Sequence, residues 1–505
     1  MNKQLLASVI LVPFAVAAAM IALNQTLNMQ LLASVILIPF AVASAAFLLE
    51  DLKQIGRVVA FLSWMQLGLI ALIVYPLFAG QTERLWLSAD FYLTRMDACF
   101  VLLTGVVASC ALTHGHLFYQ REMLAERPPT EKSVRFNYMF AMFFVLAMYA
   151  VYLCKNLGWL WICVEFTTLL SAPLVFFSRT KHALEATWKY LIICSVGISF
   201  ALLGTLFIFA SGQHGAVSGG TLRIDELIAI APKLDPRLLR FGFIFCLLGY
   251  GTKAGMFPLH SWLPDAHSEA PAPSSALLSG SLLNCALFSI WRISEVVAAS
   301  QTSTLMSNVT VWLGTITVLA ASLFLIRQYS LKRLFAYSSI ENVGVMLVAI
   351  GLNAGWLFFL QAVNHSIAKV SLFLLSGNIV QATGKKNLPQ QTGLMASAPV
   401  WAVLMTMSAF AGTGAPPFGT FLSEWLILMK AMDQHYYVNV ALVIIGLSLS
   451  FIVVCKHIGK IILGAPNPNL QYFRPLASSA IPALLVISSL CLGLFSGAAL
   501  WSGTL

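Results

Sequence analysis

Three ionisable side chains interrupt stretches that are otherwise apolar enough to lie in a lipid bilayer: Lys253, Glu165 and Glu424. A charge inside hydrocarbon is costly, so it persists mainly where it pairs with another group or lines a hydrated path. Burial disfavours the charged form of a lysine, and a nearby carboxylate restores it. Moving an acid toward or away from such a lysine therefore makes the lysine hold or release a proton. These residue types predict an ion relay within the membrane.

The composition indicates that many membrane-spanning helices position these residues. Of the 505 residues, 59% are hydrophobic and 10% are charged, which is far from the balance of a soluble protein. Membrane loops rich in Lys and Arg explain the net charge of +10 better than a nucleic-acid surface does, so no nucleic-acid partner is expected. The nine cysteines show no metal-ligand spacing and are expected to be buried, inert thiols. The predicted fold class is all-α and polytopic.

Apolar runs of spanning length predict fifteen helices. The predicted helices cover residues 5–24, 30–49, 58–80, 97–118, 135–154, 157–177, 189–211, 240–256, 274–295, 309–327, 333–353, 355–381, 397–432 (broken), 438–460 and 476–501. We count core helices 1 to 14 from the run 30–49. The predicted segments are a duplicated N-terminal stretch, the N-terminal helices, two repeats and a C-terminal helix: 1–28, 29–134, 135–300, 301–465 and 466–505.

The first two apolar runs are near copies of each other. Residues 4–17 recur as residues 30–43, with only Val12 exchanged for Ile38. Ancient repeats diverge more than this, so a recent duplication or a start site set upstream of Met29 is the better explanation. Residues 1–28 are therefore treated as a possible extra helix, and their deletion is expected to leave assembly intact.

The positive charges predict the orientation of the helices. Lys and Arg are concentrated in the loops after core helices 1, 3, 5, 9, 11 and 13, which places these loops in the cytoplasm. The loop 213–240 and the pair Arg84 and Arg95 are exceptions to this asymmetry. Within residues 213–239, the amphipathic stretch 224–231 predicts a short helix at the membrane interface.

Two runs rich in Gly and Pro are expected to break helices at membrane depth. One runs from Lys253 to Pro258, and the other from Gly412 to Glu424 through Pro416 and Pro417. The backbone groups freed by such breaks need water or side-chain partners. Paired broken helices are typical of ion sites in transporters with inverted repeats. Because the breaks fall in core helices 7 and 12, we predict two inverted five-helix repeats, helices 4–8 and 9–13.

Several motifs together resemble a known family. They are Glu165 in core helix 5, Lys253 before Pro258, the run Pro258-Leu-His-Ser-Trp-Leu-Pro-Asp-Ala-His267, the run Leu334-Phe-Ala-Tyr-Ser-Ser-Ile-Glu-Asn-Val-Gly344, and Gly412 to Glu424. Over residues 30–500 the chain resembles the antiporter-like membrane subunits of respiratory complex I, of Mrp-type cation/proton antiporters and of membrane-bound group 4 [NiFe]-hydrogenases. The Ser-Ser-Ile-Glu341-Asn342 form and the modest length resemble the F-type component of the hydrogenase-4 and formate hydrogenlyase branch.

The resemblance implies a role for each matching residue. Glu165 would pair with Lys253 and tune its proton affinity, and Lys253 would carry the proton of the first half-channel. His365 and Lys369 match residues of the central hydrophilic axis, and Glu424 would gate the exit. Supporting roles fall to residues at the helix breaks and beside the axis: Pro258, His260, Asp265, His267, Asn284, Glu341, Pro416 and Pro417.

Asn284 departs from the family pattern. The family commonly places a second lysine in core helix 8, where this chain has Ser281-Leu-Leu-Asn284. An amide cannot carry a proton as an ammonium does. Either water bridges Lys253 to His365 past Asn284, or the subunit conducts poorly.

Structural alternatives remain for the same residues. Lys253 could extend to the membrane interface, and Glu165 could cap a helix. The group His260, Asp265 and His267 resembles a metal set by composition, but satisfying the opened helix suits its position better, so no metal is expected. Lys369 shares a helix face with His365 and is either a relay residue or half of an ion pair. Five tryptophans are expected to be interface anchors: Trp159, Trp161, Trp262, Trp356 and Trp401.

The resemblance implies a proton-translocating, non-redox subunit of a hydrogenase or formate hydrogenlyase-type oxidoreductase complex. The chain would hold no cofactor, and the [NiFe] centre and iron–sulfur clusters would belong to partner subunits in a hetero-oligomer of the inner (cytoplasmic) cell membrane. The alternatives are a Mrp-type Na⁺/H⁺ antiporter subunit and an NADH:quinone oxidoreductase membrane subunit. A freestanding enzyme is the weakest interpretation, because no nucleophile–base set stands out.

Overall fold

The computed structural model describes Pro39 and residues 51–125, 128–214, 220–384, 387–388, 392–464 and 476–501. The predictions for residues 1–28 and, Pro39 apart, for the helix at 30–49 lie outside the described residues. Helices dominate the described part, which divides into two compact units, residues 1–249 and 250–505. The all-α prediction is confirmed.

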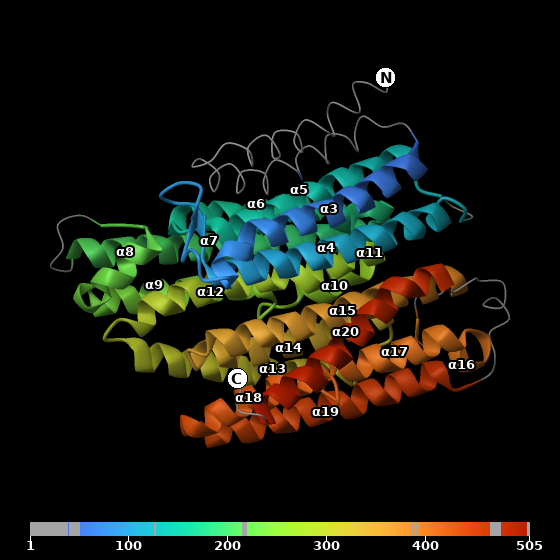
Figure 1. Cartoon of the computed structure of the whole chain (residues 1–505). Helices are drawn as coiled ribbons and strands as arrows, with labels where there is room; N and C mark the ends of the chain where they lie inside the picture. Colours follow the sequence, from blue (N-terminus) through green and yellow to red (C-terminus); the bar gives the residue numbers. More distant parts are fainter. Residues whose placement is uncertain are drawn as a thin grey trace. The chain divides into compact units, whose positions relative to one another are not determined.

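The first unit is a group of long helices with one small hairpin (Figure 1). Its helices are α3 (Leu52–Phe78), α4 (Arg95–Glu122), α5 (Glu131–Leu153), α6 (Leu157–Val175), α7 (Lys181–His214), α8 (Ile224–Ile230) and most of α9 (Pro236–Ala254). Strands β1 (Leu85–Trp86) and β2 (Tyr92–Leu93) pair antiparallel between α3 and α4. The amphipathic stretch 224–231 forms the predicted short helix as α8.

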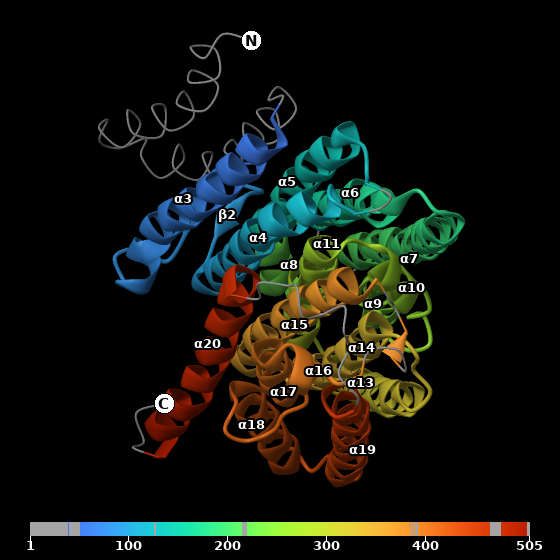
Figure 2. The same ribbon diagram turned by 90° about the vertical axis from the view of Figure 1, so that its right-hand side faces the viewer.

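The second unit surrounds two deeply buried helices, α14 and α15. Its elements are α10 (Trp262–Glu269), α11 (Ala272–Leu277), the π-helical segment η3 (Leu278–Leu282), α12 (Leu283–Ala298), α13 (Ser303–Leu325), α14 (Leu331–Gly351), α15 (Gly355–Thr383), α16 (Leu394–Ser397), α17 (Pro399–Gly412), α18 (Gly419–Asp433), α19 (Tyr437–Ile462) and α20 (Leu476–Trp501). Figure 2 looks along these helices, with α14 and α15 lying among α13, α17 and α20.

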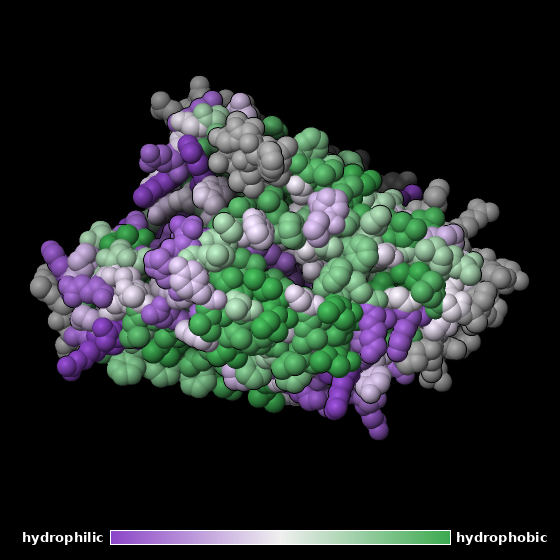
Figure 3. Space-filling view, turned by 90° about the horizontal axis from the view of Figure 1, so that it is seen from below, coloured by the Kyte–Doolittle hydropathy of each residue, from purple (hydrophilic) through white to green (hydrophobic). Residues whose placement is uncertain are grey.

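Eleven helices in the described part of the chain are long and apolar enough to cross a membrane. Helix α9 and the pair α17 and α18 fall outside this group. Helices α9 and α17 end at the two breaks, and α18 begins after the second one. Figure 3 shows one face on which hydrophobic residues form a broad band with hydrophilic residues at its margins. Such a band is what a surface in contact with lipid requires.

Both predicted helix breaks are confirmed, and a glycine sits at each. After α9, Gly255 has φ +80°, and after α17, Gly414 has φ +68°. This left-handed conformation is easily adopted only by glycine. The indole nitrogen of Trp262 donates to the carbonyl oxygen of Thr252 at 2.9 Å, so it satisfies a backbone group near the first break.

Two tryptophans differ from their prediction as interface anchors. Trp262 and Trp401 are both fully buried. The Trp401 indole donates to Ser479 Oγ at 3.1 Å. Each buried indole N–H has a partner, as burial requires, so these two side chains pack the interior.

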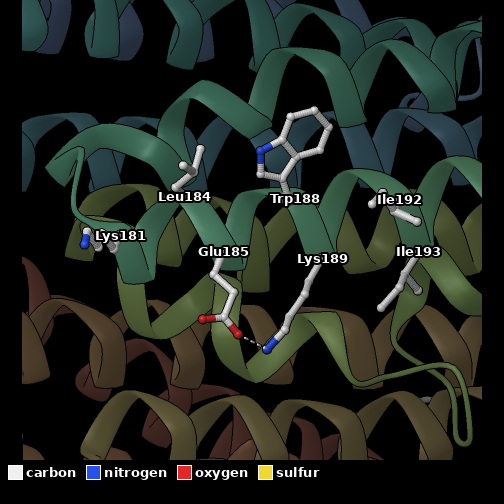
Figure 4. A pocket seen from close by; sticks show the side chains of 7 residues that line it. All are labelled: Lys181, Leu184, Glu185, Trp188, Lys189, Ile192 and Ile193. Carbon is white, nitrogen blue, oxygen red and sulfur yellow. Dashed lines mark ion pairs between the residues drawn. The ribbon is translucent and has the colours of Figure 1, made fainter.

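Two of the positive charges predicted for the loop after core helix 5 lie on helix α7 instead. Figure 4 shows Lys181 and Lys189 on the first turns of α7, along one exposed face with Trp188. Lys189 forms an ion pair with Glu185 at 2.6 Å, one helical turn away. Because both side chains are exposed to solvent, this pair contributes little to stability.

Candidate functional site

Lys369 is the centre of a polar cluster buried in the second unit. Its side chain is fully buried on α15, and its Nζ donates to Ser338 Oγ of α14 at 2.5 Å. It makes no direct ion pair with a carboxylate in the described chain. The charges of Glu341 and Glu424 nevertheless act on it. The structure therefore brings these three ionisable groups together, with a hydroxyl group as the direct partner of the ammonium.

Glu341 is a member of this cluster rather than a distant support. It lies one turn after Ser338 on α14 and is buried. Its Oε2 accepts a hydrogen bond from Ser450 Oγ of α19 at 2.7 Å. The same carboxylate also interacts with Ser338, which bonds Lys369. Ser338 thus connects the acid and the base.

Amide side chains connect Glu424 to the same cluster. Glu424 is buried on α18, which begins after the second break, and it interacts with Gln361 of α15. Gln361 Nε2 donates to Asn342 Oδ1 at 2.8 Å, and Asn342 Nδ2 contacts the carbonyl oxygen of Gly412 at 3.5 Å. The carbonyl at the end of α17 therefore gains a side-chain partner, as expected for an opened helix.

His365 faces the π-helical segment η3. Its Nε2 lies 3.3 Å from the carbonyl oxygen of Ser279, and its buried Nδ1 has no hydrogen-bond partner among the described residues. Ser279 Oγ and Ser339 Oγ are 2.9 Å apart, which joins η3 to α14. A π-helical turn displaces the regular helical hydrogen bonds and is often found at functional sites. No feature of the sequence analysis predicted it.

Asn284 lies directly beyond this segment. Its Nδ2 donates to the carbonyl oxygen of Gly280 at 3.0 Å and to Ser366 Oγ at 2.9 Å. Its Oδ1 is buried without a hydrogen-bond partner among the described residues. Asn284 therefore lies beside the helix of His365 and presents an acceptor where the family commonly has a lysine.

The charged residues near the first break link α10 and the residue after it to α14. Asp265 forms an ion pair with Arg333 of α14, and Lys332 Nζ donates to the carbonyl oxygen of Ala270 at 2.6 Å. Asp265 therefore pairs with a side chain of α14, and the expectation that the polar residues of this run satisfy the opened helix stays a prediction. Lys332 and Arg333 both contact the segment that follows the first break.

The two histidines near this break lie among aromatic rings. His267 is fully buried and stacks on Phe373 with ring centroids 4.8 Å apart, and His260 lies 5.3 Å from the ring of Phe324. Neither ring nitrogen of His267 has a hydrogen-bond partner in the described chain. Among the described residues, no three His, Cys, Asp or Glu side chains gather as a metal-ligand set.

Lys253 and Glu165 belong to different units, so their predicted pairing stays a prediction. Lys253 lies in the last turn of α9 and is fully buried, which contradicts the alternative of an ammonium extended to the interface. Glu165 lies within α6 rather than at a helix end. It accepts hydrogen bonds from Ser195 of α7 at 3.0 Å and from Thr168 at 3.3 Å.

The sequence analysis missed a buried ion pair in the first unit. Lys155 Nζ lies 2.5 Å from Asp97 Oδ2, and both side chains are fully buried. Asp97 Oδ2 also accepts from the backbone N and the Oγ1 of Thr94, where it caps α4. Lys155 lies between α5 and α6, and this position of a lysine between two apolar helices was the available signal.

Comparisons with known proteins agree with this arrangement. A family model described as "NADH:quinone oxidoreductase/Mrp antiporter, TM" matches residues 154–452. The chain is 33% identical over 392 residues to the hydrogenase-4 component F homolog of Methylacidiphilum infernorum, covering 76% of this chain and 82% of that protein. It is 28% identical over 450 residues to Na(+)/H(+) antiporter subunit A1 of Staphylococcus haemolyticus, covering 81% and 53%.

A solved structure supports the fold. The chain superimposes on a chain of the membrane-bound sulfane sulfur reductase, an archaeal respiratory membrane complex, with a TM-score of 0.79. The identity is 22%, and the match covers 92% of this chain and 95% of the other.

Proposed function

The chain belongs to the NADH:quinone oxidoreductase/Mrp antiporter membrane family, and on this premise we propose that it translocates protons within a membrane-bound [NiFe]-hydrogenase or formate hydrogenlyase-type complex. It is an antiporter-like, polytopic membrane subunit. The relative from Methylacidiphilum infernorum, a hydrogenase-4 component F homolog, supports the choice of complex. The [NiFe] centre and iron–sulfur clusters belong to partner subunits in this proposal, and the membrane is the inner cell membrane.

The observation that carries the proposal is the hydroxyl-linked cluster around Lys369. An ammonium bonded to a hydroxyl and influenced by two carboxylates has alternative sites for its proton within one connected set of groups. Proton transfer along such a set needs donors and acceptors at hydrogen-bond distance. Ser338, which interacts with both Lys369 and Glu341, meets this requirement.

The proton path extends from this cluster toward Asn284 through His365. Buried polar atoms normally have a protein or water partner. His365 Nδ1, Asn284 Oδ1 and Ser281 Oγ have none among the described residues, so we assign water to bridge them. Asn284 then orients water in place of the family's lysine, and Lys253 supplies the proton from the first half-channel with Glu165 as its partner.

A Mrp-type Na⁺/H⁺ antiporter subunit is the second candidate. The relative from Staphylococcus haemolyticus, an antiporter subunit, covers 81% of this chain and favours it. Sodium prefers several oxygen ligands, whereas the cluster around Lys369 contains a competing ammonium. This arrangement favours protons over sodium ions.

Two experiments test the proposal. Mild purification of the chain followed by mass spectrometry should recover hydrogenase subunits, and recovery of Mrp proteins alone would assign the second candidate. In the purified complex, Lys253→Ala and Glu165→Gln should abolish proton uptake into vesicles while the complex stays assembled. Normal proton uptake by either variant would refute the roles assigned to these residues.

A further inference from the structure

A basic pocket opens on the second unit at the ends of α13 and α19, and it involves none of the residues of the proton path. Its volume is about 850 Å³. Its walls are formed by residues 326–329 after α13, by Leu388 and Thr392, and by the last turns of α19. The first two walls are joined, because Leu388 N donates to the carbonyl oxygen of Tyr329 at 2.8 Å.

Positive charges converge on this pocket from two helices. Arg327 follows α13, whereas Lys456 and Lys460 stand one turn apart on α19. All three side chains are exposed and make no ion pair with any residue that the structure describes. His457 also lines the pocket, and its Nε2 is buried without a hydrogen-bond partner in the described chain. The described lining contains no carboxylate, so the site is suited to an anion.

General explanations account for the sign of these charges but not for their convergence. A cation near a helix C-terminus is favourable, which accounts for Lys460 at the end of α19. The positive-inside rule places Lys and Arg on the cytoplasmic side without requiring a common pocket. Neither explains why Arg327 lines the same cavity as the two lysines of α19.

The mouth of the pocket is apolar. Tyr329 and Leu463 are each 70% exposed, and Ile326 is 46% exposed. Because α13 ends at Leu325 and α19 at Ile462, these side chains lie where membrane helices meet the headgroup layer. A ligand with an anionic group next to hydrocarbon chains fits both parts of the pocket.

We propose that this pocket binds the phosphodiester headgroup of an anionic membrane phospholipid, with the acyl chains on Ile326, Tyr329 and Leu463. Basic pockets between membrane helices at the cytoplasmic side are suited to such headgroups. Arg327, Lys456 and Lys460 pair with the phosphate, and His457 donates to one of its oxygens. A free phosphate shares this chemistry but gains nothing from the apolar mouth.

Cys455 lines the same pocket and provides a reporter inside it. The test uses the full chain with Cys163→Ser and Cys491→Ser, which removes the other thiols in the described chain that are not buried. The chain is placed in nanodiscs of phosphatidylglycerol or of phosphatidylcholine, and the rate of Cys455 alkylation by N-ethylmaleimide is measured. Alkylation should be about tenfold slower with phosphatidylglycerol, because each basic residue at the membrane surface strengthens binding of an anionic lipid several-fold.

The combined variant Arg327→Gln, Lys456→Gln and Lys460→Gln should be alkylated equally fast in both lipids. The control variant Lys53→Gln, Arg57→Gln and Lys132→Gln removes three exposed charges from the same predicted membrane side but outside the pocket, and it should keep the tenfold difference. The variant Lys456→Arg and Lys460→Arg keeps the charge and should also keep protection, which separates lost binding from lost folding.

Two results would overturn the proposal. Equal protection of the glutamine variant and the control variant would mean that the basic pocket does not hold the lipid. Protection by inorganic phosphate in phosphatidylcholine nanodiscs, as strong as that by phosphatidylglycerol, would identify a site for a soluble anion instead.

Discussion

Two buried lysines of this chain are held in opposite ways. In the first unit, Lys155 contacts Asp97 directly at 2.5 Å, and Asp97 is fixed further by Thr94. In the second unit, Lys369 has a hydroxyl group as its direct partner, and two carboxylates act on it without a direct ion pair.

The direct pair of Lys155 with Asp97 is a structural ion pair, whereas the groups around Lys369 can exchange protons. Removing one partner of a direct buried pair leaves an uncompensated charge, so each of the two residues depends on the other. Lys369 and its carboxylates are linked through groups that both donate and accept. One arrangement stabilises the fold at the ends of α4 and α5, and the other provides alternatives for a proton.

Breaking the buried ion pair of Asp97 with Lys155 should have the largest effect on stability. Asp97→Asn leaves the charge of Lys155 buried without a carboxylate, and we expect the free energy of unfolding to fall by about 3–5 kcal/mol. Thermal unfolding of the purified chain in detergent measures this change. The double variant Asp97→Asn with Lys155→Met should recover most of the loss, because both charges are then absent.

Glu185→Gln is the matched control, since it removes an acid from the exposed pair with Lys189. It should leave the unfolding free energy nearly unchanged, because both side chains of this pair are exposed to solvent. If Asp97→Asn lowers the free energy of unfolding no more than the control does, the pair of Asp97 with Lys155 is not a structural ion pair, and the difference from Lys369 disappears.

Ser338→Ala in the second unit should lower proton uptake. It removes the hydroxyl partner of Lys369, and a hydrogen bond to a charged group contributes about 1.5–3 kcal/mol. We expect proton uptake to fall about tenfold or more, since every 1.4 kcal/mol corresponds to a factor of ten. Proteoliposomes with an internal pH dye provide the measurement. Ser338→Thr keeps the hydroxyl group and should retain most of the flux; an equal loss in both variants would show that packing, not the hydroxyl, matters.

Asn284→Lys tests whether Asn284 limits the proton flux between the half-channels. The variant places an ammonium where the family commonly has one, and proton uptake should rise a few-fold if Asn284 limits the flux. The same vesicle assay applies. An unchanged rate would mean that Asn284 does not limit conduction.

Arg333→Gln should have the smallest effect. Its ion pair with Asp265 is partly exposed, with 39% and 22% of the two side chains accessible. Such pairs contribute about 0–1 kcal/mol, so α10 should stay in place and the unfolding temperature should change little. A severe loss of stability would indicate that this pair anchors the first break more strongly than its exposure suggests.

Local signals allowed the helices and their breaks to be predicted from the sequence. Apolar runs predicted the long helices between α3 and α20 but not the short helices α10 and α16. Gly and Pro marked the breaks after α9 and α17, because both signals act within a few residues. Glu424 was identified because an ionisable residue is rare in an apolar helix, whereas His365 and Lys369 were indicated by the resemblance to the family.

The remaining features depend on contacts between distant residues. Asp97 and Lys155 are 58 positions apart, so nothing local in the sequence indicates that they pair. In the π-helical segment Leu278–Leu282, the carbonyl groups of Gly280 and Ser279 contact side chains of α12 and α15, and these contacts join residues that are distant in the sequence or lie in another helix. Ser338 and Gln361 carry no charge, so only the fold shows that they connect Lys369 and Glu424 to their neighbours.

Proton uptake by Lys369→Met tests the central claim most directly. The variant keeps the apolar stem of the side chain and removes the ammonium, and Lys189→Met on the exposed face of α7 is its control. Both proteins are reconstituted in the assembled complex, and uptake is followed with an internal pH dye. We predict that Lys369→Met abolishes uptake while its unfolding temperature stays near that of Lys189→Met. Equal uptake by the two variants would contradict a proton path through the cluster around Lys369.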